Sequence, residues 1–263
     1  MARARIWAVA NQKGGVGKTT TSVSVAGGLL QRGFRVLLVD LDPHASLSLY
    51  FGAAPGPGVH DLISTARTQA GDCLRDTPLD ALQLLCADAR LATLDRSLLQ
   101  QAGAAAVLGR KLAPLSQFDY ILLDCPPTLG VLLVSALACA DLLLMPTQTE
   151  PMAVRAVDGM LRSRALIEKS RGSALPGRIV ATLFDRRTRA GCDSLRQLER
   201  SYPELLSDHC IPVDTQLREA SRLQTTVDRL DAHGRAAVAY RLLTEELLAL
   251  DRDAAGKAVA DAA

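Results

Sequence analysis

The clearest chemical signal lies near the start of the chain, in a segment rich in glycine, lysine and threonine: Lys13, Gly14, Gly15, Val16, Gly17, Lys18, Thr19 and Thr20. The apolar residues 6–10 before it predict a buried strand, and residues 21–30 after it predict a helix. A glycine-rich turn between a strand and a helix directs backbone N–H groups and the positive end of the helix dipole at one point. Lys18 can then reach the outer phosphates of a nucleotide, and the Thr19 hydroxyl can hold Mg²⁺. The segment therefore predicts a nucleotide-phosphate cradle.

This loop departs from the usual phosphate-loop pattern at one position. The pattern has a glycine where this chain has Gln12, and Lys13 follows directly. The arrangement resembles the deviant Walker A loop of the ParA/MinD ATPase family, in which a signature lysine stands at this place. The resemblance implies that the loop binds ATP or ADP with Mg²⁺. It also implies a homodimer formed with ATP, in which Lys13 reaches the nucleotide of the partner.

Two carboxylates mark the end of the second apolar run, residues 35–41: one lies within its last residues and the other directly follows it. Asp40 and Asp42 are two residues apart, so an extended backbone places both side chains on one face. Near a triphosphate, such carboxylates suit the activation of water and the support of a metal ion. In the ParA family the corresponding motif is DxDPQ, and its second Asp is needed for hydrolysis, which implies a catalytic role for Asp42. This chain has His44 where the family motif has Gln.

A third carboxylate, Asp124, follows the apolar residues 120–123 in the strand expected at 120–125. An Asp at the end of a strand beside a phosphate loop commonly binds Mg²⁺ through water. We therefore expect Thr19, Asp40 and Asp124 to form the metal site. The following residues, 125–130, read CPPTLG and resemble the switch II segment of the family, DCPPSLG, with Thr in place of Ser.

Two short patterns downstream extend the resemblance. Residues 185–188, DRRT, resemble a DxRT element of the family, and Ile211-Pro212 resembles its IP element. Both elements flank the adenine in relatives, which implies that Arg187 and Pro212 touch the base or the ribose. The resemblance as a whole spans roughly residues 6–250.

Strand-like runs alternate with helical patterns almost throughout the chain. We expect strands at residues 6–10, 35–41, 83–86, 120–125, 141–146, 178–184 and 209–213, and helices at 21–30, 91–112, 131–138, 152–169, 195–202 and 235–250. This alternation predicts an α/β fold with a single domain, a mostly parallel, doubly wound sheet and helices on both faces, as in a P-loop NTPase. We expect the domain to cover residues 1–250 and the alanine-rich tail, 251–263, to be disordered.

The composition excludes several classes of protein. The six cysteines form no CxxC pair, which favours the reduced thiols of a cytoplasmic protein over a metal or Fe–S site. The family resemblance implies that this protein is bacterial and lies on the nucleoid or at the cell pole. We expect neither a signal peptide nor a membrane span. The tail also lacks the basic amphipathic helix with which MinD-like proteins bind membranes, so we expect no membrane partner.

Basic residues gather in the second half of the chain. Residues 151–241 hold 16 Lys and Arg against 11 Asp and Glu, whereas the whole chain has a net charge of +2. ParA proteins bind DNA non-specifically through a basic C-terminal surface, and phosphate contacts need only clustered positive charge. The resemblance implies such binding here, through residues such as Arg218 and Arg222. A solvated surface with ordinary ion pairs is the alternative, and neutral Gln216 stands where family members often carry Arg.

Three functions compete on these grounds. The first is a ParA-like ATPase that segregates chromosomes or plasmids on the nucleoid with a ParB-like activator. The second is a ParC-like ATPase that places chemotaxis arrays at the cell pole through an adaptor protein, since residues 42–47, DPHASL, and Ser135-Ala136-Leu137 resemble that branch. The third is a metabolic ATP-dependent enzyme on the same scaffold.

Overall fold

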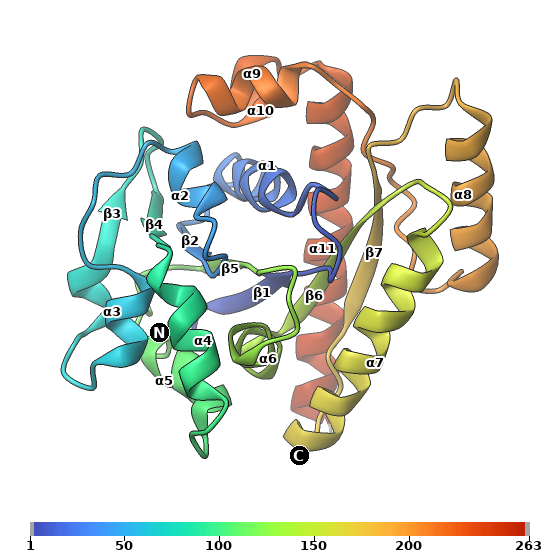
Figure 1. Ribbon diagram of the computed structural model, residues 1–263. Coiled ribbons are helices and arrows are strands. Elements are labelled where there is room, and N and C mark those ends of the chain that lie inside the picture. The colour runs from blue at the N-terminus through green and yellow to red at the C-terminus, as the bar shows by residue number, and fades with distance from the viewer. Residues whose placement is uncertain (1–2, 261–263) are drawn as a thin grey trace.

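The computed structural model describes residues 3–260, except the side chains of residue 255 and residues 257–260. In this part of the chain, a 7-stranded sheet forms the centre of the molecule, with the strand order β3-β4-β2-β5-β1-β6-β7 (Figure 1). The strands are β1 Arg5–Val9, β2 Val36–Asp40, β3 Leu74–Asp76, β4 Leu82–Leu85, β5 Tyr120–Asp124, β6 Leu142–Gln148 and β7 Gly177–Thr182. All neighbours pair in parallel except β3, which pairs antiparallel with β4.

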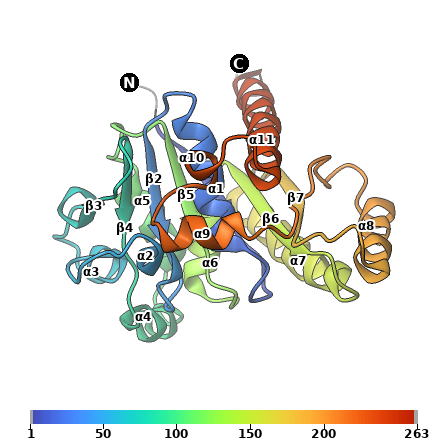
Figure 2. The ribbon, with the colours of Figure 1, turned by 90° about the horizontal axis from the view of Figure 1, so that it is seen from above.

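Helices cover both faces of the sheet, as Figures 1 and 2 show from two sides. One apolar core joins the sheet to the face formed by α3 Val59–Ser64, α4 Arg90–Leu98, α5 Val107–Leu112, α6 Val131–Cys139, α7 Ala153–Arg171 and α8 Arg189–Ser201. A second core joins the opposite face to α1 Lys18–Leu30, α2 Ser46–Tyr50, α9 Gln216–Arg222, α10 Val227–Leu230 and α11 Arg235–Ala260. The predicted fold class is thereby confirmed.

The central strands carry apolar side chains to both cores, as parallel strands covered on two sides require. In β1, Ile6 and Ala8 belong to one core, while Trp7 and Val9 belong to the other. All five residues of β2 and of β5 are buried. Because the flanking strands point the same way, their carboxyl ends meet at one edge of the sheet, where ligands bind in such folds.

Two expectations about local structure were wrong, and one strand was missed. Residues 209–213 form no strand; Pro212 makes only an isolated bridge to Phe184, because β7 ends at Thr182 and Leu183 adopts a left-handed φ of 52°. The helix expected over residues 91–112 is broken between α4 and α5, where Gly103 adopts a left-handed φ of 77°. The antiparallel strand β3 was not predicted, because its three residues, LRD, carry no alternating pattern.

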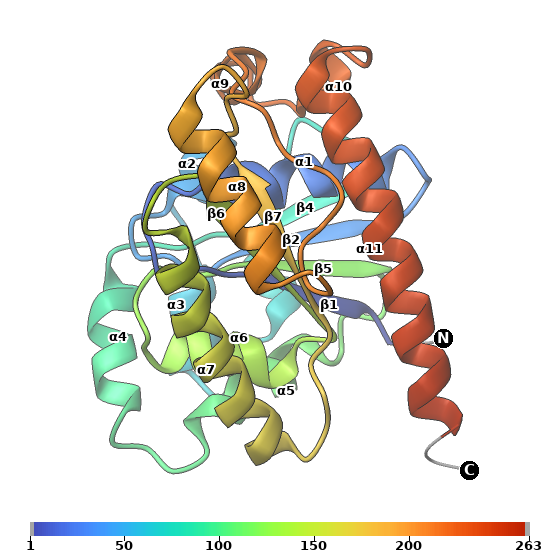
Figure 3. The same cartoon turned by 90° about the vertical axis from the view of Figure 1, so that its right-hand side faces the viewer.

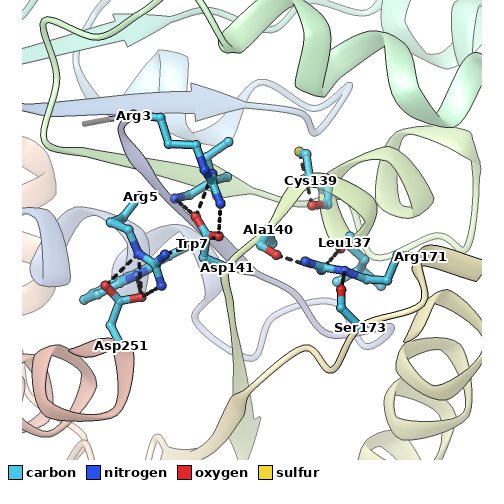
Figure 4. A network of polar contacts seen from close by, with 12 residues as sticks. Arg3, Arg5, Trp7, Leu137, Cys139, Ala140, Asp141, Arg171, Ser173 and Asp251 are labelled. Atoms are coloured by element: carbon cyan, nitrogen blue, oxygen red, sulfur yellow. Dashed lines mark hydrogen bonds and ion pairs between the residues drawn. The ribbon is translucent and has the colours of Figure 1, made fainter. Parts of the chain in front are cut away.

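The last helix extends beyond residue 250, where we expect the domain to end. Helix α11 continues to Ala260 and runs along one side of the sheet (Figure 3), and residues 261–263 lie outside the described part. Asp251 is buried and accepts hydrogen bonds from the Arg5 guanidinium at 2.7 Å and from the Trp7 indole at 3.2 Å. Arg5 also lies near Asp141, which Arg3 contacts as well (Figure 4). The contacts of Asp251 with Arg5 and Trp7 hold helix α11 against β1.

We predict that Asp251→Ala destabilises the fold by about 2 kcal/mol, because it leaves the partly buried Arg5 without its carboxylate. Urea unfolding at pH 7 measures the change. Glu245→Ala is the matched control on the same helix, since Glu245 pairs with Arg32 but is half exposed; it should cost under about 1 kcal/mol. Equal losses in the two variants would contradict the structural role of Asp251.

Candidate functional site

The glycine-rich loop joins β1 to α1 at the carboxyl edge of the sheet. Gly15 and Gly17 have φ values of 74° and 85°, a conformation that other residues adopt only with strain. Gly17 caps α1, so the first backbone N–H groups of this 13-residue helix point out of the turn. An added Cβ at Gly14, Gly15 or Gly17 would meet no heavy atom within 4 Å, so the concave side of the loop is open. The loop has the form of an anion cradle.

Buried polar residues that the sequence analysis missed fix this loop. Asn11 is fully buried; its amide donates to the Pro146 carbonyl at 2.8 Å, and its Oδ1 accepts from the Lys13 N–H at 3.0 Å. The Thr182 hydroxyl donates to the Val16 carbonyl at 2.8 Å. These contacts tie the loop to β6 and β7. The contacts with Pro146 and Thr182 could not be found from the sequence, because each joins residues more than a hundred positions apart.

The two loop lysines have different surroundings. Lys18 is buried, and its ammonium group lies 3.4 Å from the Lys13 carbonyl, inside the cradle. Lys13 is about one-third exposed and forms an ion pair with Glu150, which lies in the loop between β6 and α7. The structure therefore places Lys18 where phosphates would bind and Lys13 on the rim, near the surface.

Asp40 and Asp124 lie side by side, at paired positions of β2 and β5. Asp124 accepts hydrogen bonds from the Thr19 hydroxyl at 2.7 Å and the Ser22 hydroxyl at 3.0 Å. Burial raises the pKa of Asp124, and the nearby charge of Asp40 raises it further. Burial likewise raises the pKa of Asp40, against the effect of its hydrogen bonds to Ser48. The pair is a buried concentration of negative charge that a cation would relieve.

The oxygens at this edge suit Mg²⁺, which keeps several waters and takes few protein ligands beside phosphate. Thr19 and Asp124 present their oxygens together next to the cradle. Both oxygens of Asp40 are already engaged, one by Ser48 and the other by the Asp42 N–H at 3.1 Å. Of the three predicted metal residues, the structure thus brings Thr19 and Asp124 into contact, while Asp40 supports the loop that carries Asp42.

A cavity of about 440 Å³ opens beside the cradle and is lined in part by Gly15, Thr19, Tyr50, Pro212 and Arg218. Pro212 lines this cavity and also a neighbouring cavity of about 370 Å³, which Arg187 lines as well. The Arg187 guanidinium pairs with Asp185 at 2.8 Å. The Arg187 side chain is 83% exposed. Contact of either residue with the base or the ribose stays a prediction.

The segment after Asp124 lines a further cavity, together with Asp42 and His44. Cys125 is buried, and burial raises the pKa of its thiol well above the ordinary range. Leu129 is 60% exposed although it is a large apolar residue. At Gly130, an added Cβ would collide with the Asp95 carboxylate, which accepts from the Leu132 N–H at 2.7 Å. Gly130 is thus required by a close approach of α4 to the start of α6.

The comparisons with known proteins agree with this geometry. The AAA_31 family model, described as an AAA domain, matches residues 4–175. The chromosome-partitioning ATPase Soj of Treponema pallidum is 31% identical over 243 residues, which cover 92% of this chain and 96% of that protein. The chromosome partitioning protein ParA of Caulobacter vibrioides is 32% identical over 263 residues, 97% of each.

One solved structure is also similar over nearly its whole length. It is cobyrinic acid a,c-diamide synthase from Mycobacterium smegmatis with a bound ATP analog and magnesium. The TM-score is 0.80 and the identity 34%, and the match covers 93% of this chain and 94% of that one. The residues that the family model matches include the glycine-rich loop and all three carboxylates.

We predict that Asp124→Asn stabilises the ligand-free protein by about 1 kcal/mol, as substitutions that remove strain at functional sites commonly do. A carboxyl whose pKa is raised on folding is destabilising when ionised, and that cost is present at neutral pH. Urea unfolding at pH 7.5 in EDTA measures the change. Asp119→Asn is the control, because Arg35 lowers the pKa of Asp119; a gain in both variants would contradict the argument.

Proposed function

Because the chain belongs to the ParA/MinD family of deviant-loop ATPases, we propose that it binds Mg-ATP, dimerises with ATP and hydrolyses it to position a cargo in the bacterial cytoplasm. The observation that carries this proposal is the cradle with two lysines, one inside and one on the rim. A monomeric phosphate site needs only the inner lysine. The outer lysine has a natural use as a contact to the nucleotide of a partner.

Each residue of the site has a role in this proposal. Lys18 and the backbone N–H groups of the loop hold the phosphates of ATP or ADP. Thr19 and Asp124 hold Mg²⁺, which neutralises charge on the phosphates when it is bound. Asp42 orients or deprotonates the attacking water, and Lys13 of one subunit stabilises the charge on the phosphoryl group held by the other.

The surface around the cradle supports a dimer in which the two subunits contact each other at the carboxyl edge of the sheet. Leu129 and Met152 are 60% and 50% exposed, and they follow β5 and β6, the two neighbours of β1. Lys13 lies on the same edge and is partly exposed. Exposed apolar side chains beside a partly exposed lysine are what an interface closing over two nucleotides would bury.

The cargo that we propose is DNA, as the names of the partitioning relatives suggest, with a ParB-like protein as activator. The arginines of α8 provide the support. Arg189, Arg196 and Arg200 are exposed and share one side of the helix. On that side Asp193 pairs with Arg196 at 2.7 Å and lies 3.6 Å from Arg189, so three arginines stand against this one carboxylate. Phosphate contacts need only such clustered charge. In this proposal the protein is found on the nucleoid, and a polar protein adaptor is the outcome if DNA binding fails.

Two arginines expected from the sequence are less suitable. Arg218 lines the cavity beside the phosphate cradle, so its replacement would disturb the nucleotide site as well. Arg222 directly follows Ser221, which lines the same cavity, so a change there could also disturb the nucleotide site. The substitutions that test DNA binding are therefore placed in α8.

The cobyrinic acid a,c-diamide synthase structure raises a metabolic function as an alternative. Amide transfer from glutamine uses an activated cysteine or a separate source of ammonia. Burial instead raises the pKa of five of the six thiols, those of Cys73, Cys86, Cys125, Cys139 and Cys210. These five thiols lack the lowered pKa of a nucleophile. Because the partitioning relatives also match over nearly the whole chain, partition is the function that we propose.

We predict that Asp42→Ala lowers the ATPase rate at least about a hundredfold, the usual effect of losing a general base, while ATP binding persists. Because the trapped ATP state cannot turn over, light scattering should show an accumulated dimer. Lys13→Ala is the matched variant, which should bind ATP as a monomer. Wild-type turnover in Asp42→Ala would refute the role of Asp42, and an ATP-dependent dimer of Lys13→Ala would refute the contact in trans.

We also predict ATP-dependent, non-specific DNA binding that weakens steeply with salt. Arg196→Glu combined with Arg200→Glu should weaken it about tenfold or more in a mobility-shift assay and reduce the dependence on salt. Arg67→Glu combined with Arg110→Glu, two exposed residues outside the basic half, is the charge-matched control. An ATP-bound dimer with no affinity for DNA at low salt would exclude the DNA cargo and favour a protein cargo.

A further inference from the structure

The turn after β2 contains a contact that the mechanism above does not use. Oδ1 of Asp42 accepts two hydrogen bonds from His44, one from its backbone N–H at 3.0 Å and one from Nδ1 at 2.8 Å. Pro43 between them has a fixed φ and no N–H, which suits a tight turn. A carboxylate can only accept, so Nδ1 carries the hydrogen. His44 therefore holds one oxygen of Asp42 with two donors.

The other oxygen of this carboxylate is left open. In residues 3–260, no group donates a hydrogen bond to Oδ2 of Asp42, while its backbone is fixed on both sides. Its N–H donates to Asp40 at 3.1 Å, and its carbonyl accepts from the Ala45 N–H at 2.8 Å. With the backbone and Oδ1 held, the carboxylate has one orientation, and Oδ2 is free to accept a hydrogen from water.

Two other turns show what a different residue does at the same spacing. Arg90 stands two residues after Asp88, and Arg187 stands two residues after Asp185. In both turns the backbone N–H of the arginine donates to Oδ1 of the aspartate. The guanidinium also reaches Oδ2, at 2.7 and 2.8 Å, so both carboxylate oxygens are occupied. An imidazole ring offers only one donor on that side. His44 thus orients a carboxylate without blocking it.

A histidine two residues after an aspartate does not by itself produce this contact. The same spacing occurs at Asp231 and His233, where the backbone N–H of His233 donates to Oδ1 of Asp231 at 3.1 Å. The ring of His233 makes no hydrogen bond within the described residues. The contact of the imidazole with the carboxylate is therefore particular to the turn that contains Pro43.

We propose that His44 is a positioning residue for ATP hydrolysis, which turns the Asp42 carboxylate so that Oδ2 meets the attacking water. The inference rests on the proposed function, in which Asp42 acts on that water. The His44 side chain is 81% exposed and belongs to neither core. Its replacement should therefore change the carboxylate and leave the fold intact.

Steady-state ATP hydrolysis by the full chain tests the proposal. We expect His44→Ala to lower kcat about tenfold, the effect of losing one hydrogen bond to a charged group, with KM for ATP unchanged. His44→Asn should restore kcat to within about twofold of wild type, because its amide nitrogen occupies the position of Nδ1. His44→Arg should be at least as slow as His44→Ala, because a guanidinium closes both oxygens. His233→Ala is the matched control and should behave as wild type.

The hydrogen bond itself can be observed without turnover. In long-range ¹H–¹⁵N NMR spectra near pH 8, the His44 ring of the wild type should be the Nδ1–H tautomer, since the partner of one ring nitrogen sets the tautomer. Asp42→Ala should shift the ring to the Nε2–H tautomer. The spectrum of His44→Asn assigns the signal among the four histidines of the chain.

The outcomes separate this inference from the proposed function. An Nδ1–H tautomer that depends on Asp42, with slow His44→Ala and restored His44→Asn, supports it. A wild-type kcat in His44→Ala overturns it while the Asp42→Ala result still stands. Equal loss in His44→Ala and His44→Asn, or an Nε2–H tautomer in the wild type, also overturns it. A wild type without ATP turnover removes the proposed function and this inference together, whatever the tautomer.

Discussion

The burial of two neighbouring carboxylates is the constraint on which the rest of the site depends. Asp40 and Asp124 occupy paired positions on adjacent central strands and are almost fully enclosed. Ionised groups in such a place are costly unless hydrogen bonds or a cation compensate them. Hydroxyl groups of Thr19, Ser22 and Ser48 supply part of the compensation. Thr19 and Ser22 belong to α1 and Ser48 to α2, so the carboxylates fix the helices that carry the loops of the site.

The close packing of α1 follows from the same need to bring its first turn to Asp124. An added Cβ at Gly27 would lie 2.3 Å from the Asp228 carboxylate, and one at Gly28 would lie 2.5 Å from the Thr244 hydroxyl. Two consecutive glycines therefore let α10 and α11 lie directly on α1. The helix that presents the phosphate cradle is held by the sheet on one side and by the C-terminal helices on the other.

Much of the fold and of the candidate site could be predicted from the sequence, because the motifs that form them are contiguous. The strand, loop and helix around Lys18 lie within one stretch, and Asp40 and Asp124 end runs of apolar residues whose strand character is plain. Contacts between distant segments were out of reach, because no local pattern reports them. Asn11 and Thr182 are ordinary polar residues in the sequence, and their value comes from packing against the loop. The roles proposed for the site residues remain predictions.

The same limit applies to the segments around the two cavities beside the loop. Residues 185–188 resemble an adenine-flanking element, and a local ion pair with Asp185 holds the Arg187 guanidinium in the neighbouring cavity, which Pro212 also lines. Residues 209–213 are apolar enough for a strand, but they meet the end of β7 only through an isolated bridge beyond Leu183, whose φ is 52°, so the segment becomes an irregular wall of the cavity. In both places a local turn that no hydrophobic pattern reports decides the backbone: the Asx turn at Asp185 and the left-handed Leu183. The turn at Asp42 is likewise an Asx turn and contains Pro43, which is why the residue type at position 44 can decide how the Asp42 carboxylate is presented.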